Sequence, residues 1–204
     1  LLSLIPGMYT KSFGSIETKG ELTLAGFVKG TYSEKQMPAF NLNMVVKDAM
    51  FKYPELPTAI NNINLDLLVD NKDGIIDHTT IDLKKLHLDF GANPVDARAR
   101  ITALYPTNLD AEISAALNLG EVDKMFPLEG LDMKGNYALN LKAQGVYDSI
   151  KGSIPAINAA MSLADGYVKS SGFPVPIEDI HFSSTVKNTS GKMAETVLAV
   201  NDLS

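Results

Sequence analysis

Residues 96–103 read DARARITA and residues 109–117 read LDAEISAAL, so apolar side chains occupy nearly every second position of both stretches. A period of two places the apolar residues on one face of a β-strand and the polar residues on the other. Strands of a parallel sheet that is covered on both faces read instead as continuous Val, Ile and Leu runs. The two stretches therefore predict strands of a mainly antiparallel sheet with one face in water.

The same alternation recurs along most of the chain, and turn-forming residues separate the predicted strands. Asn71–Gly74 and Asn188–Gly191 read as hairpin loops, because Asn and Gly tolerate the positive φ that tight turns need. Residues 120–126, which Pro127 follows, are a candidate for a short helix. We therefore expect an all-β fold: a curved, mostly antiparallel sheet or open β-groove with a few short helices.

The composition excludes several classes of function. The 204 residues include 18 Lys and Arg against 24 Asp and Glu, a formal net charge of −6 at pH 7. Nucleic-acid binders carry basic patches, so we expect no nucleic-acid partner. Cysteine is absent, which excludes disulfides, thiolate zinc sites and a cysteine nucleophile. No apolar run approaches the roughly 20 residues of a membrane-spanning helix.

Self-comparison of the sequence reveals an internal repeat. Lys19-Gly20 recurs as Lys134-Gly135 at an offset of 115, and Pro38-Ala39 recurs as Pro155-Ala156 at an offset of 117. Copies of a one-faced sheet placed edge to edge extend a single apolar surface. Because the second copy stops early and the chain opens without Met, we expect a piece of a longer protein. The predicted parts are a leading segment (1–18), a complete first repeat unit (19–118), a short helical connection (119–133) and a truncated second unit (134–204).

Few residues suggest reaction chemistry. His87 and Asp89 lie two residues apart on one predicted strand face, which suits a metal ion or a general base, but a solvated polar face explains them more simply. Asp70, Asp73 and Asp77 lack the spacing of an EF-hand and fit a plain hairpin. The sequence has no nucleophile elbow, P-loop or dinucleotide fingerprint. We predict no catalytic residue, no metal site and no cofactor.

The alternating apolar residues allow two arrangements. Two sheets can close on each other as a sandwich with these residues in its core, or one sheet can curl into an open trough that holds acyl chains. A lining rich in Leu, Met and Ala without Trp, and glycines at positions 26, 30 and 145 where strands can bend, favour the trough. The predicted lipid-binding residues are Leu22, Leu24, Phe40, Leu42, Met44, Leu65, Leu67, Val69, Leu86, Leu88, Leu139, Leu141, Met161 and Phe182.

Six segments carry a distinctive pattern: LIPGMYTK (4–11), GELTLAG (20–26), GTY (30–32), MPAF (37–40), AMFKYPELP (49–57) and INNI (60–63). Together they resemble the AsmA family of envelope proteins, and above all its long members from Bacteroidetes. The resemblance implies a periplasmic β-rich region of a protein that an N-terminal inner-membrane helix anchors, linked to outer-membrane assembly. It also implies a relation to TamB-type bridge-like lipid-transfer proteins, in which stacked β units form a long hydrophobic groove.

On these grounds we expect a non-enzymatic periplasmic module that supports outer-membrane assembly. It shields or transfers lipid acyl chains, of phospholipid or of a lipopolysaccharide precursor, by burying apolar area at roughly 25 cal/mol per Å². The alternative is a protein-binding scaffold for outer-membrane protein targeting or assembly. Such a scaffold pairs with its partner through an exposed strand edge, and its apolar face closes as an ordinary core.

Overall fold

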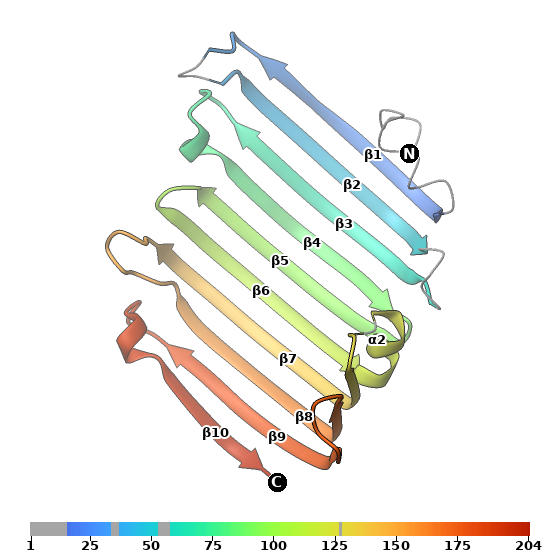
Figure 1. The fold of residues 1–204 in the computed structure, drawn as a ribbon. Helices are drawn as coiled ribbons and strands as arrows, with labels where there is room; N and C mark the ends of the chain where they lie inside the picture. The colour runs from blue at the N-terminus through green and yellow to red at the C-terminus, as the bar shows by residue number, and fades with distance from the viewer. Residues whose placement is uncertain (1–15, 34–36, 53–57, 127) are drawn as a thin grey trace.

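The structure is a computed structural model that describes residues 16–33, 37–52, 58–126 and 128–204. Ten strands form one antiparallel sheet in which each strand lies beside its neighbours in the sequence (Figure 1). The strands are β1 Glu17–Lys29, β2 Ala39–Lys52, β3 Ile60–Asn71, β4 Thr80–Phe90, β5 Asn93–Ala103, β6 Thr107–Asn118, β7 Leu131–Tyr147, β8 Ala156–Ser170, β9 Ile177–Asn188 and β10 Val197–Leu203. The prediction of an all-β, antiparallel fold is confirmed.

Helices contribute little to the described residues, which contain α2 Leu119–Met125 and the short 3₁₀ turns η2 Ile76–His78 and η3 Met193–Glu195. The side chain of Asn118 accepts a hydrogen bond from the Glu121 N–H (3.1 Å), which caps the first turn of α2 where the sequence predicts a helix. Strand β7 begins at Leu131, so residues 131–133 of the predicted helical connection belong to a strand.

Antiparallel pairing decides which side chains share a face, because residues directly opposite each other point to the same side. Leu24 of β1 lies opposite Met44 of β2, and Met44 lies opposite Leu67 of β3. We call the side that carries these residues the apolar face. Arg98 of β5 and Glu112 of β6 form a pair on the other side, which we call the polar face.

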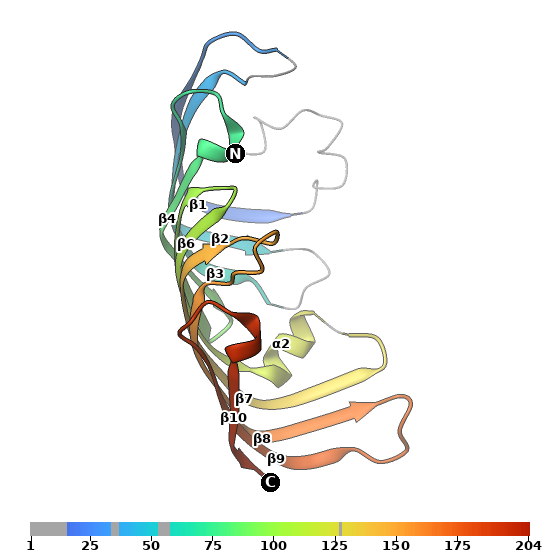
Figure 2. The ribbon, with the colours of Figure 1, turned by 90° about the vertical axis from the view of Figure 1, so that its left-hand side faces the viewer.

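The sheet is curved, and the apolar face lies on its concave side. Figure 2 shows the sheet edge-on, bent toward the side on which α2 lies. The ring of Phe126, directly after α2, meets the ring of Phe90 edge-to-face with centroids 5.9 Å apart. Phe90 follows Leu86 and Leu88 at every second position of β4, and Leu86 lies opposite Leu65 of β3 on the apolar face. Helix α2 therefore covers one end of this face.

The two predicted hairpin turns are each held by one buried asparagine. Asn71 Nδ2 donates to the Ile75 carbonyl (2.7 Å) and to Thr79 Oγ1 (2.9 Å), and its Oδ1 accepts from the Gly74 N–H (2.7 Å). Asn188 makes the three corresponding contacts at 2.7 or 2.8 Å. Both asparagines are only 1% exposed, so all their polar atoms depend on these bonds.

Unusual backbone geometry also recurs at the offsets of the predicted repeat. Gly20 and Gly135, 115 residues apart, have φ of +112° and +121°. Asp48 and Asp165, 117 residues apart, have φ of +45° and +53°, a conformation that L residues rarely adopt. The turns η2 and η3 also begin 117 residues apart. The backbone thus shares these features at the repeat offsets, and the two repeat units with their boundaries stay a prediction.

Some predictions fall outside the described residues. They concern residues 1–15 of the leading segment, which include LIPGMYTK, and residues 53–57 of AMFKYPELP. None of the helices in the part of the chain that the structure describes has the length and apolar character needed to cross a membrane.

The asparagine turns generate a prediction about stability. We expect Asn71→Ala to lower the free energy of unfolding by about 2 kcal/mol, because it leaves a buried N–H and two acceptors without their partner. Asn43→Ala, at an exposed position of β2, is the matched control, with an expected change below about 0.5 kcal/mol. Urea denaturation measures both changes, and equal losses in the two variants contradict the role assigned to Asn71.

Candidate functional site: the apolar face of the sheet

All fourteen residues predicted to line a trough lie on the apolar face. Direct cross-strand partners among them are Leu24 and Met44, Met44 and Leu67, Leu42 and Val69, Leu65 and Leu86, and Leu139 and Met161. The remaining members, which keep the same alternation or lie opposite other residues of this face, are Leu22, Phe40, Leu88, Leu141 and Phe182. One continuous row across six strands joins the two halves of the set: Leu65, Leu86, Ala97, Ile113, Leu141 and Ala159.

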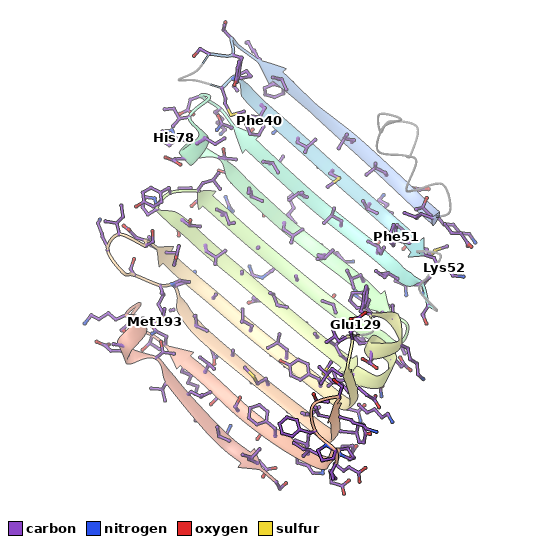
Figure 3. All side chains as sticks on the ribbon, in the orientation of Figure 1. Phe40, Phe51, Lys52, His78, Glu129 and Met193 are labelled. Atoms are coloured by element: carbon purple, nitrogen blue, oxygen red, sulfur yellow. The ribbon has the colours of Figure 1, made fainter. Side chains whose placement is uncertain are left out.

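The apolar face is open along most of its extent. In the described part of the chain, no second sheet lies over it, and α2 is the only α-helix. Leu24, Val28 and Ile113 are 54%, 73% and 38% exposed, which a closed core does not allow. Figure 3 shows mostly carbon atoms in the side chains in front of the sheet, the side on which α2 lies. A sandwich core is therefore absent from the described residues, and the curved open sheet is the arrangement found.

Small side chains deepen this face. Ala143 and Ala159 are only 9% and 3% exposed, because larger side chains on the neighbouring strands shield them from water. At the β1 end, a hollow of about 550 Å³ lies against residues 24–28 and 40–42. Gly26 lines this hollow, and the backbone of Asn41 approaches it so closely that a Cβ at position 26 would clash with the Asn41 carbonyl oxygen. The face thus offers recesses as well as apolar area.

Several residues of the apolar face were missing from the predicted set. Ile81 lies opposite Val69, and Leu83 lies opposite Leu67, so both belong to it. Between Leu83 and Leu86 the register of β4 shifts, and the alternation in its sequence changes parity there. The sequence shows the alternation in each half of β4. Only the position of the bulge shows that the apolar residues of both halves lie on the same face.

Ion pairs rather than apolar contacts tie the strands together on the polar face. Arg98 lies 2.8 Å from Glu112 and 3.2 Å from Asp110, and Lys142 lies 3.0 Å from Glu112. Hydrogen bonds from Arg98 and then Lys142 hold the pKa of Glu112 at about 2, below its ordinary value of 4.5. One sheet therefore presents a hydrated charged face and an apolar face on opposite sides.

The histidine candidate His87 lies on the polar face, away from the predicted lining residues. His87 Nδ1 is 2.7 Å from Asp96 Oδ1, and His87 Nε2 is 3.5 Å from Asp89 Oδ1, on the polar face of β4 and β5. His78 Nδ1 contacts Asp73 (2.6 Å) at the η2 turn and lowers the pKa of that carboxyl. Among the described residues, no group of three or more His, Asp or Glu side chains is arranged to hold a metal ion. These three pairs are surface contacts between β4 and β5, within β4, and at the η2 turn.

The Glu112 cluster generates a prediction about pH dependence. Because folding depresses the pKa of Glu112, its ionised form stabilises the fold above pH 4.5, and this contribution is lost as the pH falls to about 2. We therefore expect the stability difference between the parent chain and Glu112→Gln to be constant above pH 5 and to shrink between pH 4.5 and 2. Urea denaturation at a series of pH values measures it, and a difference that does not change with pH contradicts the role of the cluster.

Comparison with models of protein families, with curated proteins and with solved structures found no match for this chain. Support for a function therefore comes from the open apolar face itself.

Proposed function

We propose that this chain is a non-enzymatic module that shields or transfers lipid acyl chains on the apolar face of its sheet. The observation that carries the proposal is a continuous apolar surface, ten strands wide and concave, that no second sheet covers in the described part of the chain. Monomeric proteins rarely expose apolar patches of this extent unless the patch binds something. The resemblance to the AsmA family leads us to propose in addition a periplasmic location and a role in outer-membrane assembly.

The dimensions of the apolar face suit an acyl chain. Ten strands give nine spacings of about 4.8 Å, so the face measures about 43 Å across the strands. An acyl chain of one bilayer leaflet spans about 15 Å, half of a hydrocarbon core of about 30 Å. The face is therefore long enough for a whole acyl chain in any position along it, which suits a surface over which a lipid moves.

The chemistry of the face suits a ligand that is recognised by area rather than by directed bonds. Each buried CH₂ group contributes about 0.8 kcal/mol, whatever its position along the chain. Leu, Met, Ile and Ala side chains supply this contact without fixing the identity of the headgroup. On the opposite side, the charged residues around Glu112 keep the sheet hydrated. A lipid headgroup can stay in water while the acyl chain lies on the concave side.

The protein-scaffold alternative requires the apolar face to close as a core. Only three apolar residues, Met125, Ala143 and Ala159, are buried among the described residues, which is far fewer than a closed core contains. This count favours the lipid proposal over the scaffold, and the experiment below separates the two.

Charged substitution of a facing pair tests the proposal. Met44 and Leu67 lie opposite each other on the apolar face, and we expect Met44→Asp with Leu67→Asp to abolish co-purifying lipid, because each added carboxylate makes apolar contact costly. Native mass spectrometry of the purified chain, followed by lipid extraction, measures the bound lipid. Circular dichroism verifies that the variant keeps its strand content.

The adjacent pair on the other face is the matched control. Asn43 and Leu68 lie opposite each other on the same two strands and point to the polar face. Asn43→Asp with Leu68→Asp adds the same charge at neighbouring positions, and we expect it to retain lipid. A parent chain that carries no lipid, or equal retention in the two folded double variants, refutes an acyl-binding apolar face.

A further inference from the structure

The outer edge of β10 is a strand edge without a partner among the described residues, because β10 lies last in the sheet. Ser204 and His181 exchange both backbone hydrogen bonds, each 3.0 Å long. In an antiparallel ladder such pairs alternate with residues whose N–H and C=O point the other way. The N–H and C=O of Leu203 therefore point away from β9, toward the free edge.

This edge lacks the features that keep sheet edges from pairing. Proline is absent from β10, VLAVNDL, and Asp202 is its only charged residue. Val197, Leu198 and Leu203 are 61%, 64% and 71% exposed. Natural edge strands that must stay single carry proline, lysine or inward-pointing charges. Strand β10 is therefore competent to pair with a further strand.

Strand β10 has the geometry of β4, displaced by 117 residues. Both follow an asparagine turn and a 3₁₀ turn, and β4 begins at Thr80 whereas β10 begins at Val197. Both strands also contain a bulge at the equivalent place. In β4 it lies between the partners of Asp66 and Leu67, which are Lys85 and Leu83. In β10 it lies between the partners of Ser183 and Ser184, which are Asp202 and Val200.

The strand that pairs with the outer edge of β4 indicates which kind of strand can pair with the equivalent edge of β10. Strand β4 pairs there with β5, with Leu86 opposite Ala97 and His87 opposite Asp96. The positions equivalent to Leu86 and His87 are Leu203 and Ser204. Strand β5 in turn pairs with β6 before the sheet continues to β7. The equivalent edge therefore fits a two-stranded unit.

Strand β1 of a second copy does not match this position. Its register shift between Lys19 and Glu21 has its equivalent in β7, between Lys134 and Asn136. Strand β7 follows β6, not β4, in the order of the sheet. We propose that the outer edge of β10 binds an antiparallel β-hairpin with the pattern of β5 and β6, which places small apolar residues on the apolar face and alternating charges on the polar face.

Cysteine trapping tests the proposal, because the chain contains no cysteine of its own. The probe is a synthetic peptide of residues 93–118, which span β5 and β6. In the proposed register Ser204 faces position 96 of the peptide as a non-hydrogen-bonded pair, whose side chains lie close together. Each peptide thiol is first activated as a mixed disulfide with an aromatic thiol, so that attack by the chain's thiolate forms the new disulfide and releases the aromatic thiolate. We expect the Ser204→Cys chain to form a disulfide with the activated Asp96→Cys peptide more than roughly tenfold faster than with the activated Ala97→Cys peptide, whose sulfur points to the opposite face.

A second pair of variants tests whether the backbone edge carries the binding. We expect Leu203→Pro, which removes an N–H from the free edge, to abolish trapping in the Ser204→Cys chain, and Leu203→Ala, which keeps that N–H, to preserve it. Equal trapping rates with the two peptides, no trapping, or disulfide-linked dimers of the chain in place of the peptide adduct each overturn the proposal. The comparison of the two peptides decides the matter even where Leu203→Pro fails to fold.

Discussion

The backbone ladder between sequential antiparallel strands is the interaction on which the rest of this structure depends. Ten strands pair in chain order, and each gains its hydrogen bonds from its immediate neighbours in the sequence. Because the strands alternate in polarity with a period of two, the ladder also sorts every side chain to one of two faces. The described residues therefore form a sheet without a second layer, and its stability is spread over contacts between neighbouring strands rather than concentrated in a central core.

Local devices hold this open sheet in shape. Buried Asn71 and Asn188 satisfy the turn backbone at one rim, and α2 packs Met125 and Phe126 against the other. On the polar face, Arg98 and Glu112 join β5 and β6 by an ion pair. Each device acts over one or two hairpins. Such local stabilisation is what repeat architectures use, and it lets a sheet grow without enclosing its apolar side.

An uncovered apolar face and an unprotected strand edge have related consequences. The face offers contact area to a flexible apolar ligand without selecting its headgroup, because area burial is non-directional. The edge of β10 offers directed backbone bonds, which select a strand of defined register. A strand added beyond β10 would lengthen the same concave face. The proposed pairing at the edge and the proposed binding on the face would therefore reinforce each other.

The period-two alternation of stretches such as DARARITA determined by itself the strand class, the antiparallel pairing and the membership of one face, since side-chain parity is a local property of a strand. Asn71 and Asn188 likewise marked their turns, because turn chemistry is local. Only the tertiary structure decided that the face is open and that the bulge in β4 brings Leu83 and Leu86 to one side. Whether a second layer covers a sheet, and how strands shift past a bulge, depends on contacts between segments distant in the sequence, which a local pattern does not contain.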